Sequence, residues 1–259
     1  MFSDRSLSRA VESVRERHAP DALVLDCERD FETLSTAQAE ELGLVTDRLT
    51  PASVPQEWVP ADAPEVLERY AASDLTIGMP GDGGVAWTRQ TEPPVVLVKP
   101  RLEGSPEEFV DFLIAEALVE VGLDVPEHFL GFFEAEYARF VDVTRTALDP
   151  PGTYQLASAC YDAYLGRQTR RIFAAWEGEL FDAWIDAGER LEPRLAELSG
   201  AVARGETEFP AAAELACSAV KHDCEIPPPF DALDTSVYLD HGPAYAVEWA
   251  ERTIAALDG

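Results

Sequence analysis

The strongest fold signals of this chain lie in residues 74–133, which read DLTIGMPGDGGVAWTRQTEPPVVLVKPRLEGSPEEFVDFLIAEALVEVGLDVPEHFLGFF. The stretch opens with two apolar, β-branched runs, Asp74–Met79 and Val85–Gln90, on either side of the glycine-rich segment PGDGG. Glycines between two strand-like runs predict a β-hairpin. Val95–Val98 is the most strand-like run, and the two prolines before it favour a strand start or a sheet edge.

The rest of the stretch predicts two helices. Ser105, Pro106 and Glu108 have the residue types expected at the N-cap, first and third positions of a helix. This helix is expected to run to Val121, with apolar residues almost all round, which is typical of a buried helix. A second helix is expected to begin within 124–127 and to carry a series of aromatic residues.

Outside this stretch, apolar periodicity predicts one more strand, Ala22–Cys27, and several helices. Ser3 is the expected N-cap of the first helix. Residues 50–64 contain four prolines and are expected to form an extended connector. The predicted helices are Ser3–His18, Thr36–Arg48, Ala63–Ser73, Thr153–Trp176, Glu179–Leu198, Pro210–Cys224 and Gly242–Leu257.

The fold class that follows is α+β, predominantly α-helical, with a small sheet or hairpin at residues 74–98. The strand Ala22–Cys27 can join this sheet. We expect a single domain over residues 1–259, with a weak internal boundary near 50–64 and a helical array from about residue 105 to 259. The length and a hydrophobic content of 46% are sufficient for a sizeable core.

The charge balance is strongly acidic. The chain has 49 Asp and Glu residues against 20 Lys and Arg, a net charge of −29, and only two lysines, Lys99 and Lys221. An acidic, lysine-poor chain that is still apolar predicts a protein from a cell with molar internal salt, where the Debye length is about 3 Å. An acidic surface for a basic partner is the alternative. Nucleic-acid binding is not expected, because the sequence has no basic stripe.

The sequence also predicts the state of the cysteines and the cellular location of the protein. Cys27, Cys160, Cys217 and Cys224 are scattered, so no disulfide framework is expected. The first 20 residues are charged and lack the apolar core of a secretory signal. No apolar run approaches the 18 residues of a membrane span. We therefore expect a cytoplasmic protein without membrane segments.

A pattern that suits a metal site lies within residues 74–133. Glu116 and Glu120 are one turn apart on the apolar helix, and His128 follows it. Carboxylate and imidazole groups are suitable ligands for zinc or manganese. In the alternative interpretation, one glutamate pairs with an arginine such as Arg101 or Arg139 and the other is solvated.

A second group of possible ligands is Cys217, His222 and Cys224. Zinc sites usually use closer cysteine pairs, and two cysteines seven residues apart can share a buried helix face. We therefore favour a core role for them. The glycine-rich segment 80–84 is followed by a strand-like run and not by a helix, which argues against phosphate binding.

Residues 94–140 resemble the core of a minimal zincin metallopeptidase, with a strand, a turn, a helix bearing a glutamate and a downstream histidine. In that family two helix histidines flank the glutamate as H-E-x-x-H. The matching residues here are Ala115-Glu116-Ala117-Leu118-Val119. The resemblance implies Glu116 as catalytic base and His128 as a possible third ligand. Because Ala115 and Val119 replace the histidines, it implies a relative that cannot hold zinc in the family's way.

The whole chain is similar to a haloarchaeal family of conserved proteins of unknown function. The similarity rests on GMPGDGGVAWTRQTEPPVVLVKPRL (78–102), PEHFLGFFE (126–134), ELACSAVKHDCEIPPPFDALDT (214–235) and HGPAYAVEWAERT (241–253). It implies a salt-loving archaeal origin and assigns no activity.

Two functions are expected from different classes. The first is a non-catalytic binding or interaction module, without cofactor, that contacts a protein partner or a second copy of itself. The alternative is a metal-dependent hydrolase-like enzyme or pseudoenzyme that uses Glu116, Glu120 and His128 with zinc or manganese. Convergence of these three side chains on one point would favour the enzyme.

Overall fold

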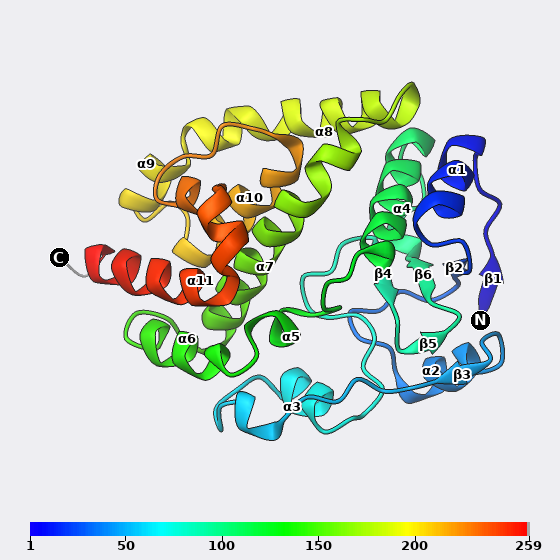
Figure 1. The fold of residues 1–259 in the computed structure, drawn as a ribbon, viewed down its shortest axis with the longest axis horizontal. Coiled ribbons are helices and arrows are strands. Elements are labelled where there is room, and N and C mark those ends of the chain that lie inside the picture. Colours follow the sequence, from blue (N-terminus) through cyan, green and yellow to red (C-terminus); the bar gives the residue numbers. More distant parts are fainter. Residues whose placement is uncertain (258–259) are drawn as a thin grey trace. The chain divides into compact units, whose positions relative to one another are not determined.

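The computed structural model describes residues 1–257, and the chain divides into two compact units. Unit 1 consists of Met1–Val54, Glu65–Glu127 and Glu177–Ala183, and unit 2 consists of Pro55–Pro64, His128–Trp176 and the segment from Trp184 onward. The predicted fold class is confirmed: the fold is α+β, with a small mixed sheet and a majority of helix (Figure 1).

Unit 1 is built on a four-stranded sheet with the order β1-β2-β6-β4. The strands are β1 (Phe2–Asp4), β2 (Leu23–Cys27), β6 (Val95–Val98) and β4 (Val85–Thr88). β2 is parallel to β6 and antiparallel to β1, and β4 is antiparallel to β6. All four residues of β6 are buried, as expected for a strand covered on both faces. β6 is therefore a central strand and not an edge strand.

The predicted hairpin is wrong in its first arm. Residues 74–79 form no strand, and β4 pairs with β6 instead. The connection between them contains β5 (Thr91–Glu92), which pairs with β3 (Arg48–Leu49) in a separate two-stranded sheet.

Tertiary contacts explain why 74–79 is not a strand. Gly78 has φ of 78°, and a Cβ there would lie 2.4 Å from the Glu32 carbonyl oxygen. Ile77 is fully buried in the apolar cluster beneath the sheet, and its carbonyl oxygen accepts a 2.9 Å hydrogen bond from the Leu34 amide. The segment is held by packing against residues 31–34 and not by a ladder of strand hydrogen bonds.

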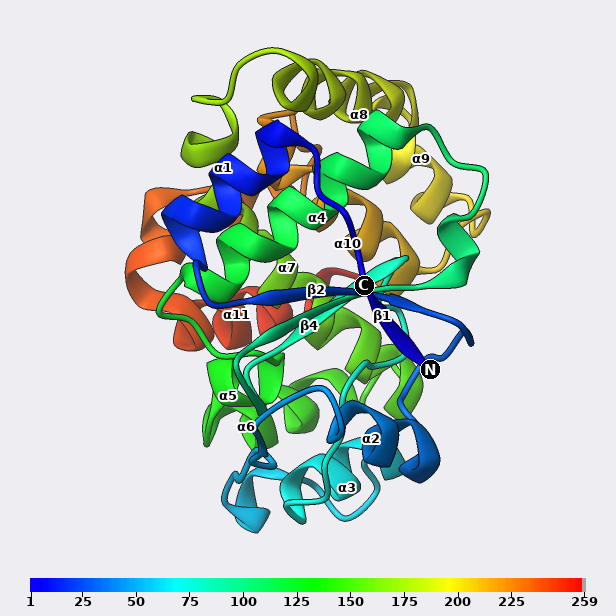
Figure 2. The ribbon, with the colours of Figure 1, turned by 90° about the vertical axis from the view of Figure 1, so that its right-hand side faces the viewer.

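Two helices of unit 1, α1 (Arg9–His18) and α4 (Glu107–Gly122), lie side by side over one face of the sheet (Figure 2). The predicted N-cap Ser3 is wrong, because Phe2–Asp4 pairs with β2, and Ser8 caps α1 instead. Pro106, and not Ser105, takes the N-cap position of α4.

The other helices of unit 1 are short. α2 (Thr36–Leu42) opens with a capping box made by Ser35 and Gln38. It ends before the predicted limit, since residues 48–49 form β3. α3 (Glu65–Ala71) follows the proline-rich connector. A 3-10 turn, η2 (Pro100–Leu102), links β6 to the segment before α4, and another, η1 (Gln56–Trp58), lies in the connector itself, which belongs to unit 2.

In its described residues, unit 2 has only helices as regular elements, joined by turns and by the proline-rich connector. Its elements are α5 (Phe129–Phe133), α6 (Glu136–Thr144), α7 (Pro150–Phe173), α9 (Leu198–Ala203), α10 (Phe209–Ser218) and α11 (Ser236–Leu257), with the 3-10 turns η3 (Val220–His222) and η4 (Phe230–Leu233). α8 (Glu179–Ala196) begins in unit 1, continues in unit 2 and contains Pro193. α7 packs against α10, and α11 packs against α6 (Figure 1).

Several predicted helix boundaries in unit 2 are wrong; α10, for example, ends at Ser218 and not at the predicted Cys224. The helix expected to begin within 124–127 begins only at Phe129, and it is divided into α5 and α6 because Glu134 has a positive φ of 50°. α11 begins before the predicted Gly242, and this glycine, with φ of 51°, kinks the helix next to Pro243. Within residues 1–257, no helix combines the length and apolar character needed to cross a membrane.

Candidate functional site

Glu116 and Glu120 both lie on α4 in unit 1. The Glu116 side chain is buried. Oε2 of Glu120 accepts a 2.7 Å hydrogen bond from Nε1 of Trp87, on β4. The two arginines considered as partners have other carboxylates: Arg101 pairs with Asp30 and Glu32, and Arg139 pairs with Glu136. Glu120 therefore helps to attach α4 to the sheet.

His128 lies in unit 2, where it is the N-cap of α5. Its Nδ1 accepts a 3.1 Å hydrogen bond from the Leu130 amide. The imidazole packs on the Phe129 ring at 4.1 Å between centroids, and burial lowers its pKa from 6.5 to about 3. His128 is therefore a neutral capping residue at physiological pH.

A metal site built on these residues has no geometric support beyond the sequence pattern. In the described part of the chain, no three His, Cys, Asp or Glu side chains are placed together so that they could hold a metal ion. The set Glu116, Glu120 and His128, with zinc or manganese, thus stays a sequence-based prediction.

The second group of possible ligands has structural roles. Cys217 is buried in α10. Nδ1 of His222 lies 3.0 Å from the Trp184 carbonyl oxygen, and the Cys224 thiol donates to the Gly188 carbonyl oxygen at 3.7 Å. The favoured core role of these residues agrees with their contacts, and all four cysteines are buried free thiols.

A buried polar network at the end of β4 was not foreseen from the sequence. The Glu127 carboxylate accepts hydrogen bonds from Thr88 Oγ1 (2.6 Å), the Arg89 amide (2.8 Å) and Gln90 Nε2 (2.8 Å). The Arg89 guanidinium donates to the Leu123 carbonyl oxygen at 3.0 Å. The network attaches the segment after α4 to the sheet. Its two sides, residues 88–90 and residues 123–127, are more than 30 positions apart in sequence, so no local pattern could have indicated it.

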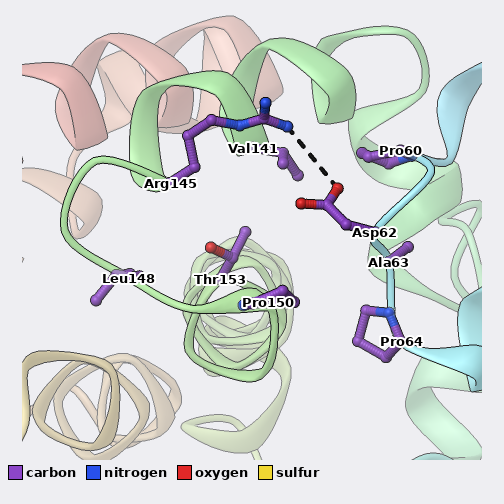
Figure 3. Close-up of a pocket in the computed structure, with 9 residues that line it drawn as sticks. All are labelled: Pro60, Asp62, Ala63, Pro64, Val141, Arg145, Leu148, Pro150 and Thr153. Atoms are coloured by element: carbon purple, nitrogen blue, oxygen red, sulfur yellow. Dashed lines mark ion pairs between the residues drawn. The ribbon is translucent and has the colours of Figure 1, made fainter.

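Unit 2 contains a pocket of about 170 Å³ between the proline-rich connector and the turn from α6 to α7 (Figure 3). Asp62 and Arg145 line this pocket and point toward one another from opposite walls, with 3.8 Å between the carboxylate oxygen and the guanidinium nitrogen. The pocket is lined by Pro60, Asp62, Ala63, Pro64, Val141, Arg145, Leu148, Pro150 and Thr153.

The guanidinium of Arg145 is loosely held. It lies 3.8 Å from Asp62 and 3.5 Å from Asp142, and both distances exceed the usual 2.7–3.2 Å of a direct N–H···O hydrogen bond. Thr153, by contrast, is buried and its hydroxyl lies 3.0 Å from that of Thr144. The pocket thus combines an opposed pair of charges with a wall that is mostly apolar.

Taken together, the fold and these sites define an acidic, mostly helical α+β protein with a small pocket in its helical unit. Comparison with family models places residues 1–257 in a family of unknown function, DUF7089, and the chain belongs to this family. No curated protein and no solved structure matches it. The expected whole-chain membership of a family without assigned activity is confirmed, whereas the haloarchaeal origin and the zincin-like core remain predictions.

Proposed function

We propose that this protein is a non-catalytic binding module that holds a small zwitterionic molecule, such as a free amino acid, in the pocket of unit 2. The observation that carries the proposal is the opposed pair Asp62 and Arg145 across a pocket with apolar walls. A guanidinium is suited to a carboxylate, and a carboxylate to an ammonium group. The pocket therefore offers one partner for each charge of a zwitterion.

The existing ion pair is easily replaced. The side chains of Arg145 and Asp62 are 51% and 60% exposed, and an exposed pair of this kind contributes only about 0–1 kcal/mol. A ligand that brings both charges would exchange one weak contact for two direct hydrogen-bonded ones. Val141, Leu148 and Pro150 supply apolar contacts for the body of such a ligand.

The size of the pocket favours a small ligand. A volume of about 170 Å³ corresponds to roughly five or six water molecules at about 30 Å³ each. The lining residues include no His or Cys, and the Thr153 hydroxyl lies against another threonine hydroxyl and not against a base. This composition favours binding over nucleophilic catalysis.

Calorimetric titration in molar KCl tests the proposal with L-valine as the probe. Isovalerate and valinamide are the matched ligands, since each lacks one of the two charges. We expect valine to bind and both analogues to bind at least about tenfold more weakly, a loss of about 1.4 kcal/mol or more. Arg145→Gln should abolish the difference between valine and valinamide, because it removes the partner of the carboxylate, and should leave isovalerate the weaker ligand, because Asp62 remains. Arg139→Gln is the control, because Arg139 lies on α6, the helix for which Arg145 is the C-cap, and its side chain is 53% exposed.

Equal binding of the three ligands, or valine binding that survives in Arg145→Gln, would contradict the proposal. Elemental analysis tests the alternative function, a metal-dependent enzyme. About one equivalent of zinc or manganese in protein purified without chelator, lost in Glu116→Ala/His128→Ala, would favour a metal-dependent hydrolase-like protein.

We further propose that the protein works in the cytoplasm of a salt-loving archaeon. The support is the net charge of −29 with only two lysines, since molar salt screens repulsion between surface carboxylates. The acidic surface also suits contact with a basic protein partner, and sedimentation of the purified chain would reveal self-association.

A further inference from the structure

Unit 1 buries one of the two lysines of the chain. Lys99 follows β6 directly and is only 1% exposed. Its amide donates a 2.8 Å hydrogen bond to the Gly84 carbonyl oxygen, so the backbone at this position continues the contact between β6 and β4. A buried lysine is rare unless its charge is paired.

The ε-amino group of Lys99 has few partners. Nζ lies 3.5 Å from the Asp82 carbonyl oxygen, a long hydrogen bond, and 4.7 Å from the centroid of the Phe31 ring. None of the ion pairs within residues 1–257 includes Lys99. An ammonium group has three donors, so this environment satisfies the charged form poorly.

The charged groups around Lys99 are mostly acidic. Asp30 and Glu32 are both held by Arg101, at 2.9 and 2.7 Å, and Asp82 accepts a 2.8 Å hydrogen bond from the Met79 amide. Three carboxylates against one guanidinium do not favour an anionic ligand. Burial lowers the pKa of Lys99 from 10.5; Asp82, Glu32 and Asp30 oppose this shift, and Arg101 adds to it.

The position of Lys99 in the sheet is also that of a ligand site. β2 and β6 are parallel neighbours, and Lys99 lies at the carboxyl end of the pair, where open α/β sheets bind their ligands. The loop 78–84 covers this end. Gly81 and Gly83, at its tip, have no atom within 4 Å of where a Cβ would stand, so there is open space beside these two positions.

We propose that Lys99 is a covalent binding residue for a small aldehyde, which its ε-amino group captures as a reversible imine. The lone pair of the neutral amine forms a C–N bond to the carbonyl carbon, and the carbonyl π electrons move to the oxygen, which takes up a proton. Loss of one water from this carbinolamine forms the C=N bond. Amine and aldehyde thus give imine and water, and no oxidant or reductant is needed.

Aldehyde capture at Lys99 is independent of the zwitterion pocket, because the two sites use residues of different units. The Phe31 ring face makes a cation–π contact with Nζ, which stabilises the ammonium form, so it is burial and the single long hydrogen bond that favour the neutral amine. The Asp82 carbonyl oxygen can accept an N–H of the neutral amine, which leaves the lone pair available.

Reductive trapping tests the proposal. Folded wild-type protein in molar KCl near pH 8 is treated with propanal and sodium cyanoborohydride, and peptide mass mapping follows each amine separately. Lys221 is the internal control, since it is only half-buried. We expect Lys99 to be labelled faster than Lys221, because burial lowers the pKa of Lys99 and leaves more of its amine neutral near pH 8.

Labelling of Lys99 that is equal to or slower than that of Lys221, or that appears only after unfolding in urea, would overturn the proposal. A Lys99→Arg variant keeps the positive charge but cannot form the imine, so it should lose only the Lys99 adduct. In the Arg145→Gln variant, Lys99 should be labelled at the wild-type rate. Failure of aldehyde capture at Lys99 can therefore be distinguished from failure of zwitterion binding in the pocket of unit 2.

Discussion

The indole Nε1 of Trp87 donates a 2.7 Å hydrogen bond to Oε2 of Glu120 and so attaches α4 to β4. The carboxylate in this bond is one that the sequence pattern assigns to a metal. A charged acceptor makes the bond stronger than a neutral one. Its observed partner gives Glu120 a structural role that does not depend on a metal ion.

A double-mutant cycle of Trp87→Phe and Glu120→Gln measures this role. We expect Glu120→Gln to lower the free energy of unfolding by about 1 kcal/mol, because a neutral acceptor, in a bond that contributes about 0.5–1.5 kcal/mol, replaces a carboxylate, in a bond that contributes about 1.5–3 kcal/mol. The double variant should lose less than the sum of the single losses. Urea unfolding in molar KCl provides the values, with Glu107→Gln, at an exposed position of α4, as control. Fully additive losses would show that the two side chains are not coupled.

Gly122 permits the close approach of α4 to the end of α1. A Cβ at Gly122 would lie 2.2 Å from the His18 carbonyl oxygen, whereas a Cβ at Gly83 would meet nothing within 4 Å. We expect Gly122→Ala to lower the free energy of unfolding by about 1–3 kcal/mol through overpacking, and Gly83→Ala to change it by less than about 0.5 kcal/mol. Equal unfolding midpoints in urea for the two variants would contradict the close contact.

His128 predicts a specific dependence of stability on pH. Its pKa is about 3 in the folded protein and 6.5 in the unfolded chain, so between these values only the unfolded chain binds the proton. The free energy of unfolding should be unaffected by His128 above pH 6.5 and should fall as the pH decreases toward 3. Between pH 7 and pH 5 this loss is about 2 kcal/mol.

The comparison with His128→Asn isolates the contribution of this residue. Asparagine can still cap α5 but does not titrate. The difference in unfolding free energy between wild type and variant should therefore shrink or reverse as the pH falls from 7 to 5. His241→Asn, at an exposed position, serves as control and should follow the wild type. A difference that stays constant with pH would show that His128 does not have the shifted pKa.

If the protein works at molar internal salt, as proposed, its melting temperature should rise when the KCl concentration is increased from millimolar to molar. With a net charge of −29, repulsion between carboxylates opposes the folded state, and screening removes this repulsion. A variant with Glu57→Gln, Glu177→Gln and Glu251→Gln, all at exposed positions, should show a smaller rise. A melting temperature that does not change with KCl would contradict adaptation to high salt.

Local patterns predicted much of the fold correctly. The strand-like runs at 22–27, 85–90 and 95–98 all contain strands, and the apolar helix after residue 105 is present as α4. These elements follow from periodicity and β-branched residues, which act over a few positions. The errors occur where contacts distant in sequence decide. Residues 74–79 pack on residues 31–34, and Phe2–Asp4 pairs with β2, so neither follows its local preference.

Composition and local periodicity are sufficient to predict the fold class, the acidic and lysine-poor character, and the residue types available for chemistry. Which of those residues meet follows from the folded arrangement of the chain. It gave Glu120 an indole partner, made His128 a helix cap, placed Arg145 opposite Asp62 and buried Lys99 against Phe31. The physical reason is that the environment of a side chain, and hence its charge state and partners, depends on segments far away in the chain. Helix and strand periodicity does not encode these contacts.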